Sequence, residues 1–529
     1  MKRTIPILIL LLVLSGCSDQ KKAEYLLRHF ISTHEKGLEQ LHRENSRVLW
    51  ENYTRNKYPE NYYYKADSIH KIFNNRTEAE LNIRAVYNNI SEYDFLHRLQ
   101  NSGLIEDPEL KRELGKLYEQ YAWARLDFYT LNDKQAQLAN KFYDLQRSKP
   151  GDEDIQYLGT DSMLTYDKRR NELIEDYKTI IREKNAAAKK AGFKNYWSYW
   201  LDKNELSSEE QEQIISDIDS LTREDYLAFK HTIDSIILNK KGKKPEEITY
   251  SDFYLQVHNY AYPLEFKINM SKDSIKNTLI NYFKEKGFNA DNIYSTSDIW
   301  YREDKARGSF VINMDNRQDV RIYGYFKPYY WDMVNLLHET GHAFYFRSVD
   351  ANIPFMLREP NLAMNEATGF VFQSLFITDP ELGERLGMSA EEPNIFRHLK
   401  IPFMLFMTRD LLVRAELEKE IIQNPDQDIN KLFWALKKKY FFYDQPDIDK
   451  VPLWIQDTHI IHNSGIYQAY IYAAAIGSML LENVKQRDDY GRWMTENIFR
   501  FGDSRCWRDI IKDATGRDFT PGYISNLYK

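Results

Sequence analysis

The chain has 529 residues, of which 43% are hydrophobic, 29% are charged and 14% are aromatic. This composition is typical of a folded protein with a large buried core, and it excludes a mainly disordered chain. The formal net charge is −7, so nothing in the overall charge favours a nucleic-acid-binding protein.

The first sixteen residues have the pattern of a secretory signal peptide. Lys2 and Arg3 form a positively charged start, and an almost wholly apolar stretch follows over residues 5–14. This stretch is too short to cross a bilayer, because a transmembrane helix needs about 20 residues. It ends in Leu-Ser-Gly-Cys at residues 14–17, which resembles the bacterial lipobox, whose cysteine is acylated and becomes the mature N-terminus.

We therefore expect a signal peptide over residues 1–16 and a lipidated tether over 17–25 that begins with Cys17. A plain signal peptide with an incidental cysteine is the alternative. Stable membrane attachment takes more than one acyl chain. Ser18 is not the aspartate that signals inner-membrane retention in some enterobacteria. The expected location is the bacterial cell envelope, on the outer membrane and facing the periplasm or the exterior.

Residues 26–529 are expected to form the folded domain, and its first half reads as helical. Apolar residues recur at three- and four-residue spacing among charged residues, as over 107–147 and 166–191, which predicts amphipathic helices. The helical pattern continues to about residue 240, where a basic loop begins. The only cysteine besides Cys17 is Cys506, so a lipidated Cys17 leaves no intramolecular disulfide.

Two strands are predicted near the middle of the chain. Residues 309–314 and 320–326 are rich in β-branched and aromatic residues, and Asp315-Asn316-Arg317 supplies a turn between them. These features predict a short antiparallel β element.

Four helices are predicted in the second half. One opens after Pro328, one runs from Pro360 to about residue 377, and two cover 399–422 and 465–485. The expected fold is therefore mostly α with one short sheet.

The helix after Pro328 carries His338-Glu339-Thr340-Gly341-His342. Residues four apart share one face of a helix, so His338 and His342 can offer two imidazole nitrogens to one metal ion. Glu339 lies beside them, where it could accept a proton from water. The pattern is that of zinc-dependent hydrolases.

A catalytic zinc takes three protein ligands and keeps one open position. Glu366 lies 24 residues after His342, in a helical stretch with apolar neighbours, where an unpaired glutamate is costly to bury. A surface glutamate on an amphipathic helix is the alternative. Combined with the upstream motif, Glu366 is the expected third ligand, and Zn²⁺ is the expected cofactor.

This motif set resembles zinc peptidases like angiotensin-converting enzyme, in which a glutamate also follows His-Glu-x-x-His by 24 residues. Residues 316–322 are similar to that family's Asn-Arg-Lys-Asp-Phe-Arg-Ile segment, and 184–201 and 424–440 are similar to segments of its bacterial members. The resemblance covers residues 25–480. The motifs do not separate this family from the neighbouring thimet-like oligopeptidases.

The resemblance implies a two-lobed, largely helical ellipsoid with a deep central channel in which oligopeptides are hydrolysed. Glu339 would be the general base and then the general acid. The strand over 308–312 would lie along the substrate backbone, which makes Ser309 and Val311 the expected substrate contacts. We expect a monomer with no nucleic-acid partner.

The family also uses a histidine and a tyrosine to stabilise the oxyanion. His459 lies five residues after Trp454, as in bacterial relatives, and Tyr467 and Tyr470 keep the family's three-residue spacing. The expected catalytic donors are therefore His459 and Tyr470, with Tyr467 as a substrate contact. Because the interval from His459 to Tyr470 is one residue longer than in the family, His462 stays an alternative.

Four positions depart from the family pattern. Asp457 replaces a lysine that holds the substrate's C-terminal carboxylate in carboxypeptidase members, and its charge would repel that group. Gly308 replaces a substrate-binding histidine, and Ala469 replaces an arginine linked to chloride activation. Phe370 replaces an aspartate that would accept a hydrogen bond from a metal-binding histidine, so a partner for His338 must come from elsewhere.

The sequence thus favours an active zinc metallopeptidase, with a peptidyl-dipeptidase-like mode or internal cleavage both open. A thimet-like endopeptidase and a catalytically weak peptide-binding lipoprotein on the same scaffold are the alternatives. A purely structural zinc is disfavoured, because such sites normally fill all four positions with protein ligands.

Overall fold

In the computed structural model, the described residues are 19–55, 77–147, 155–157, 165–261, 267–305, 308–443 and 451–528. The expected signal peptide and Cys17 lie outside these residues. In the described part of the chain, no helix combines the length and the apolar character needed to cross a membrane.

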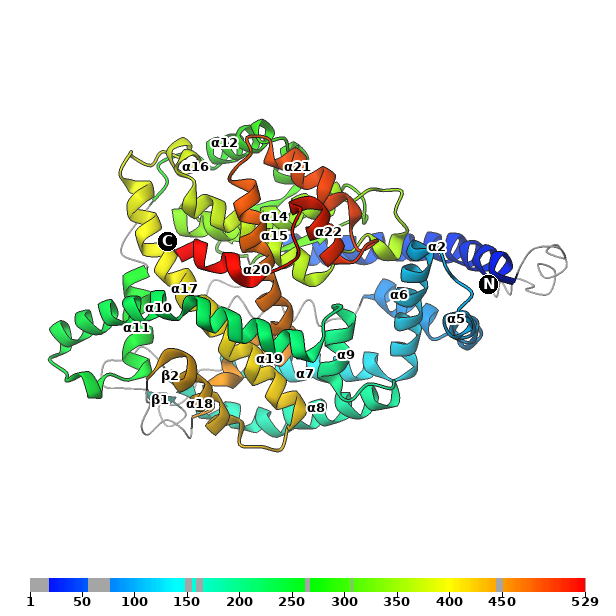
Figure 1. Ribbon diagram of the computed structural model, residues 1–529, viewed down its shortest axis with the longest axis horizontal. Coiled ribbons are helices and arrows are strands. Elements are labelled where there is room, and N and C mark those ends of the chain that lie inside the picture. The colour runs from blue at the N-terminus through cyan, green and yellow to red at the C-terminus, as the bar shows by residue number, and fades with distance from the viewer. Residues whose placement is uncertain are drawn as a thin grey trace.

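Helices α2 (Asp19–Arg55), α5 (Ile90–Ser102) and α6 (Pro108–Arg125) lie at one end of the long axis (Figure 1). Together with α4 (Glu78–Tyr87) they bury a small core of their own, separate from the main core. Residues 19–25, which belong to the expected tether, form the first turns of α2. The reason is that Ala23, Leu27 and Ile31 recur at four-residue spacing and are buried in this small core.

A second group of helices forms the lower layer in Figure 1. Its helices are α7 (Phe128–Arg147), α8 (Glu172–Lys190), α9 (Tyr196–Lys203), α10 (Ser208–Lys241), α11 (Tyr250–Ala261), α18 (Ile429–Phe441) and α19 (Thr458–His462). Its short elements are β1 (Ile155–Tyr157), β2 (Thr165–Asp167), η2 (Lys168–Asn171), η3 (Pro245–Glu247) and η5 (Leu453–Gln456).

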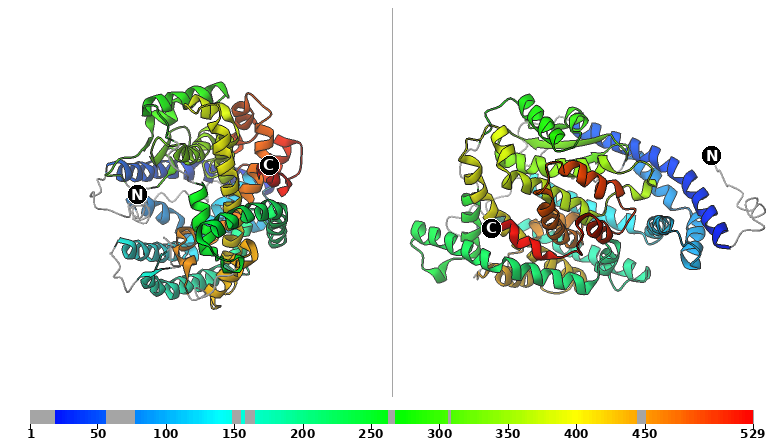
Figure 2. Two further views of the ribbon diagram at one scale, coloured as in Figure 1. Left: turned by 90° about the vertical axis from the view of Figure 1, so that its left-hand side faces the viewer. Right: turned by 45° about the horizontal axis from the view of Figure 1, so that its top comes forward.

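The upper layer holds the helices of the metal motif (Figures 1 and 2). Its helices are α12 (Lys272–Glu285), α13 (Asp291–Thr296), α14 (Tyr330–Ser348), α15 (Leu362–Thr378), α16 (Pro380–Arg385), α21 (Tyr490–Asn497) and α22 (Trp507–Thr515), with η4 (Phe355–Leu357) and η6 (Phe499–Phe501). Helices α17 (Glu392–Gln423) and α20 (Tyr467–Val484) run between the two layers, and η7 (Pro521–Tyr528) packs on α20.

Local signals set the ends of the long helix α10. The Ser207 side chain accepts a hydrogen bond from the Glu210 backbone N–H, and the Glu210 carboxylate accepts one from the Ser207 N–H. This reciprocal cap starts the helix. Gly242 ends it with a φ of 62°, a left-handed conformation that glycine adopts at low energetic cost.

The described residues form two sheets: β1 and β2 make a small antiparallel pair, and the larger sheet has three strands in the order β3 (Asp298–Trp300), β5 (Val320–Phe326) and β4 (Phe310–Asn313). Strands β4 and β5 are antiparallel, with Phe310 opposite Tyr323, which confirms the predicted hairpin. In its turn, an Asp315 carboxylate oxygen accepts hydrogen bonds from three successive backbone N–H groups. The parallel strand β3 was not predicted, because three residues are too few for a recognisable pattern.

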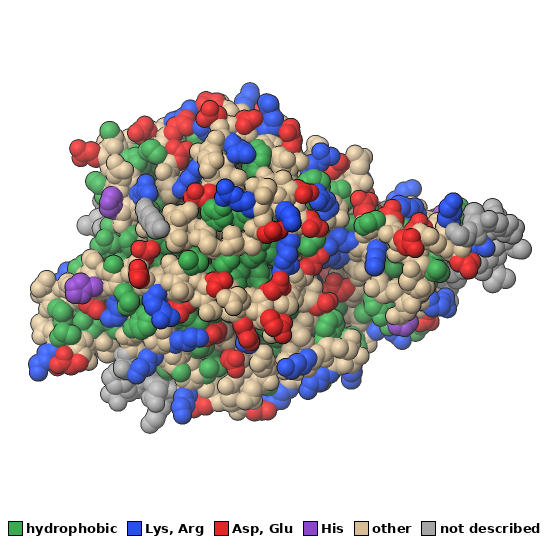
Figure 3. Space-filling model, viewed as in Figure 1, with side chains coloured by type: hydrophobic (Ala, Val, Ile, Leu, Met, Phe, Trp, Pro, Cys, Tyr) green, Lys and Arg blue, Asp and Glu red, His purple; other side chains and the backbone are tan. Residues whose placement is uncertain are grey.

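The main core is centred on α15, which packs against α14 on one side and against α20 on another. A Cβ on Gly341 of α14 would lie 2.8 Å from the Thr368 backbone oxygen of α15, so glycine allows the two helices to cross closely. The mostly helical fold is confirmed. On the face shown in Figure 3, acidic and basic side chains are interspersed, without a large patch of one sign.

Candidate metal centre

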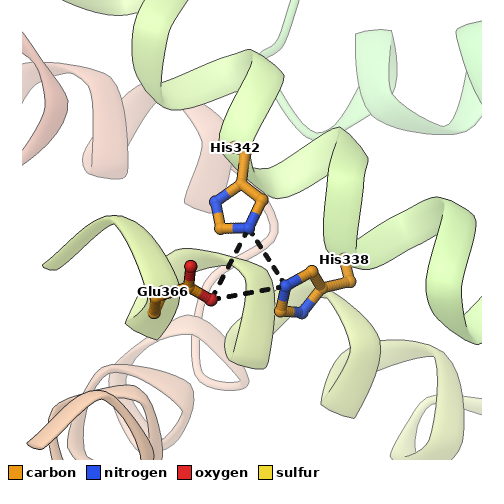
Figure 4. A group of neighbouring side chains, drawn as sticks. All are labelled: His338, His342 and Glu366. Atoms are coloured by element: carbon orange, nitrogen blue, oxygen red, sulfur yellow. Dashed lines mark hydrogen bonds and ion pairs between the residues drawn. The ribbon is translucent and has the colours of Figure 1, made fainter. Parts of the chain in front are cut away.

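Helix α14 places both motif histidines toward a common point (Figure 4). The Nε2 atoms of His338 and His342 lie 3.0 Å apart, and the two rings meet at an angle of 87°. The four-residue spacing produces this arrangement, because it brings both side chains to one face of the helix.

Glu366 approaches the same point from α15. Its Oε2 atom lies 3.6 Å from Nε2 of His338 and 3.8 Å from Nε2 of His342. Zinc bonds of about 2.0–2.1 Å in tetrahedral geometry separate ligand atoms by about 3.4 Å. The three distances lie around this value, so the residues fit a zinc ion, and the described residues bring the three expected ligands together.

A glycine on α15 makes room for the first histidine. A Cβ on Gly369 would lie 2.6–2.8 Å from three ring atoms of His338, closer than van der Waals contact allows. The imidazole of His338 therefore lies directly on the backbone of α15. This contact brings His338 of α14 within reach of Glu366, which is on α15.

The outer nitrogens of the two histidines differ in their partners. Nδ1 of His342 lies 3.0 Å from the side-chain oxygen of Asn365, an interaction that leaves Nε2 unprotonated for a metal. Nδ1 of His338 is buried and makes no hydrogen bond among the described residues, although the Gln373 amide interacts with this histidine. Phe370, from which no hydrogen bond to His338 was expected, packs near Gly477 of α20.

Tyr470 of α20 lies beside the three ligands and hydrogen-bonds to Glu366. Burial opposes ionisation of Glu366, but the contacts with both histidines and with Tyr470 lower its pKa to about 2. Burial and the charge of Glu366 raise the pKa of Tyr470 well above its usual value. The tyrosine therefore keeps its proton and can donate a hydrogen bond.

Glu339 is buried on α14 between the two histidines in sequence, with 8% of its surface exposed. Its charge acts on both His338 and Tyr470. The structure thus places the expected general base next to a metal ligand and next to an expected oxyanion donor. We call His338, Glu339, His342 and Glu366 the metal wall.

A cavity of about 590 Å³ opens onto this site. His338 and Glu366 line one side of it, and helices α17 and α20 line the other. A second cavity, of about 670 Å³, lies among α5, α6 and α9 and has no metal-wall residue in its lining. Metal-dependent hydrolysis requires the substrate to reach the metal ligands, so the 590 Å³ cavity is the candidate active site.

The side of the cavity opposite the metal wall carries charged and aromatic groups. We call Asp410, Arg414, Asp457, His459 and Tyr467 the charged wall; all except Asp457 line the cavity. Nε of Arg414 donates to Asp410 at 2.6 Å, and Nη1 contacts both Asp457 and the Tyr467 hydroxyl. Lys437 completes the network through an ion pair with Asp410.

The expected repulsion by Asp457 needs correction. Its carboxylate accepts hydrogen bonds from the Tyr467 hydroxyl at 2.8 Å and from the His459 backbone N–H at 2.9 Å, and it pairs with Arg414. These partners neutralise the aspartate. The Arg414 side chain lines the cavity and keeps 34% of its surface exposed, while its charge is shared between Asp410 and Asp457. Ion pairs between residues 43 positions apart leave no local sequence pattern.

The structure distinguishes the two candidate oxyanion histidines by position. His459 is exposed, lines the cavity and meets the Tyr470 ring edge-on, with the ring centroids 5.9 Å apart. His462, at the end of α19, is not among the described lining residues of the cavity. The ring centroids of Tyr467 and Tyr470 lie 5.9 Å apart, so Tyr467 belongs to the same ring cluster as His459 and Tyr470. The roles of His459, Tyr467 and Tyr470 stay predictions.

The structure does not bring the expected strand contacts to this cavity. Val311 is half-buried on β4, and Ser309 directly precedes that edge strand. Neither residue is in the described lining of the 590 Å³ cavity. Phe310 on the same strand packs against Tyr53 of α2 instead. Substrate binding by Ser309 and Val311 therefore remains a prediction.

Comparison with known proteins agrees with a metallopeptidase fold. No protein-family profile matches the chain. Carboxypeptidase 1 of Bacillus subtilis is 22% identical over 301 residues, which cover 49% of this chain and 58% of that relative. This chain thus matches little more than half of the relative's length.

Solved structures match over nearly the whole chain. A carboxypeptidase from Deinococcus radiodurans has a TM-score of 0.66 and 14% identity, covering 95% of this chain and 98% of that one. PZ peptidase A has a TM-score of 0.64 and 13% identity, with 96% of each chain covered. The TM-scores over nearly the whole chain establish the fold, and at identities this low they establish the fold alone. The names give no support to the narrower expectation of a peptidyl-dipeptidase like angiotensin-converting enzyme.

Proposed function

We propose that the protein is a zinc metallopeptidase that hydrolyses peptide bonds of short peptides. The observation that carries the proposal is the convergence of His338, His342 and Glu366 at separations of 3.0–3.8 Å beside a 590 Å³ cavity. A zinc ion bound there supplies Lewis acidity, which polarises a carbonyl and lowers the pKa of water.

The protein side chains divide the proton transfer and charge stabilisation between them. The Glu339 carboxylate takes the proton from the attacking water and passes it to the departing amine. Tyr470 and His459 donate hydrogen bonds to the substrate oxygen as it becomes negative. Burial of Tyr470 keeps its hydroxyl protonated for this role.

We further propose that the enzyme is a carboxypeptidase. Arg414 faces the cavity, and a guanidinium binds a carboxylate through strong, charge-assisted hydrogen bonds. The names of the fold relatives support this mode for those proteins. Release of C-terminal dipeptides and internal cleavage, as in thimet-like oligopeptidases, are the alternatives. A catalytically weak peptide-binding protein on this scaffold would bind the same peptides without cutting them.

The test is digestion of defined peptides by the zinc-loaded full chain, with fragments identified by mass spectrometry. We expect loss of one C-terminal residue at a time and no cleavage after removal of zinc by a chelator. Dipeptide products or internal fragments would reject the carboxypeptidase mode. Binding without any cleavage would reject the peptidase proposal.

We also propose that the enzyme acts at the bacterial envelope, on the basis of the signal-like pattern before Cys17 alone. Cells that express the full chain with labelled palmitate should incorporate label into the protein. A Cys17→Ser variant should not. Equal labelling of the two proteins, or none in either, would reject lipid attachment at this cysteine.

A further inference from the structure

Helix α17 forms one long side of the active-site cavity. Its lining residues include Lys400, Phe403, Met404, Met407, Leu411 and Arg414. Their spacing of three and four residues marks one face of the helix. At 1.5 Å per residue, Lys400 and Arg414 lie about 21 Å apart along α17. An extended peptide covers that distance with about six residues.

Between Lys400 and Arg414, most of the side chains that α17 presents to the cavity are apolar, and Thr408 and Asp410 are the polar ones. Phe370 and Ile377 of α15 and Ala473 and Ala474 of α20 line the same cavity as the methionines of α17. The two alanines leave space for a ligand side chain on the α20 side. Apolar lining with a few placed polar groups is the usual character of a site that binds an organic ligand.

The exposure of Met407 distinguishes this part of the cavity from the buried core. Met407 is 40% exposed, in contrast to the fully buried apolar residues that follow on the same helix, such as Leu412 and Val413. A large apolar side chain exposed within a concave site gains stability when a ligand covers it. Methionine is flexible, so it can adapt to ligand side chains of different shapes.

We propose that the preferred substrates are peptides with large apolar side chains in their last three residues. This inference rests on the proposed peptidase function. The terminal carboxylate binds Arg414, which places the preceding residues along Leu411, Met407 and Met404. Met407 lies seven residues, or about 10.5 Å, from Arg414 along the helix, which is about three residues of extended peptide.

The test uses hexapeptides with a free carboxylate that end in Leu-Phe-Leu. In matched peptides, glutamate or lysine replaces one of the last three residues. For the zinc-loaded full chain we expect kcat/KM to fall by about tenfold or more with a charged residue, the discrimination that an apolar pocket provides. Equal kcat/KM values across the set would overturn the inference while leaving the peptidase proposal intact.

Substitutions on α17 link the preference to the proposed surface. In Met407→Lys, kcat/KM for the apolar peptide should fall about tenfold and that for a glutamate-containing peptide should rise. Ile395→Lys is the matched control, because Ile395 is an exposed apolar residue of α17 outside the cavity lining. If Met407→Lys fails to fold, Met407→Ala replaces it, and the apolar preference should shrink. An unchanged preference in the folded variant would overturn the inference.

Binding separates this inference from the proposed function. The zinc-loaded Glu339→Gln variant lacks the general base, so calorimetry can measure Kd for the same hexapeptides without cleavage. We expect the apolar peptide to bind about tenfold tighter than its charged counterparts. That result would support the inference even if the wild-type protein cut no peptide. Equal affinities, or no binding of any hexapeptide, would overturn it.

Discussion

The two walls of the cavity are built by different forces. The metal wall comes from α14 and α15, whose close crossing depends on glycine, and its ligands lie within a 29-residue stretch, 338–366. The charged wall draws on α17, α19 and α20, and ion pairs and hydrogen bonds hold it together. This difference indicates that close helix packing positions the metal ligands. Ion pairs between residues far apart in the sequence position the groups on the opposite side of the cavity.

The largest effect should come from the metal wall. Replacing Glu339 with glutamine removes the proton acceptor and keeps the size of the side chain. We expect kcat to fall by about 10²–10⁴-fold, because that is the usual contribution of a general base. Zinc content should stay unchanged by mass spectrometry. As a control, Glu416→Gln alters a glutamate of α17 that pairs with Lys439 outside the site, and it should retain full activity.

Gly369→Ala tests whether backbone packing positions His338. The added Cβ would overlap the ring of His338, so the ring must move away from Glu366. We expect zinc affinity to fall by about 10–100-fold, similar to the loss of a group that orients a metal ligand. Competition with a zinc chelator measures this affinity. Gly37→Ala is the matched control, since a Cβ there contacts nothing within 4 Å; equal affinities of the two variants would contradict the packing argument.

Arg414→Lys tests the charged wall. Lysine keeps the charge but loses the planar fork that contacts Asp410, Asp457 and a carboxylate together. We expect KM for peptides with a free carboxylate to rise about tenfold. C-terminally amidated peptides, which lack the carboxylate, should change little. A similar rise for both peptide types would show that Arg414 supports the fold instead of binding the carboxylate.

Replacing Glu418 should have the smallest effect of these substitutions, and the effect should be on the stability of the fold. This carboxylate is fully buried on α17, where it accepts a hydrogen bond from the Tyr467 backbone N–H at 2.9 Å at the start of α20. Burial raises its pKa to about 8. Because the unfolded chain ionises this group above about pH 4.5 while the folded chain keeps it protonated, Glu418 reduces stability increasingly from about pH 4.5 to pH 8.

Glu418→Gln should therefore flatten the pH dependence of the melting temperature over that range, by about 1–3 °C. Differential scanning calorimetry at pH 5 and pH 8 measures the change, with Glu416→Gln, at a half-buried glutamate of the same helix, as the control. Activity should change less than in any metal-wall variant. An identical pH dependence in Glu418→Gln and the wild type would show that this carboxylate ionises freely in the folded protein.

The same contrast explains what the sequence could predict. The metal wall follows from short-range signals, namely the spacing of His338 and His342 and a glutamate within an apolar helix. Helical periodicity likewise predicted most of the long helices, and β-branched and aromatic residues around a turn predicted the β4–β5 hairpin. Asn365 was missed, although its place directly before Glu366 was a usable signal.

The charged wall could not be predicted in the same way. Arg414 and Asp457 meet only after the chain folds, and each looks like an ordinary surface charge in its own segment. For the same reason, the sequence suggested a repulsive Asp457 where the structure shows a neutralised one. The helical start of α2 over 19–25 was not predicted, because its partners in the N-terminal core lie far along the chain, in α5 and α6.

Metal analysis of the full chain tests the central claim most directly. Mass spectrometry and zinc X-ray absorption should show one zinc per chain with two imidazole nitrogens and a carboxylate among its ligands, and Glu366→Gln should bind zinc far more weakly. A full chain that binds no zinc would contradict the account. So would a zinc without imidazole ligands, or a Glu366→Gln variant with unchanged affinity.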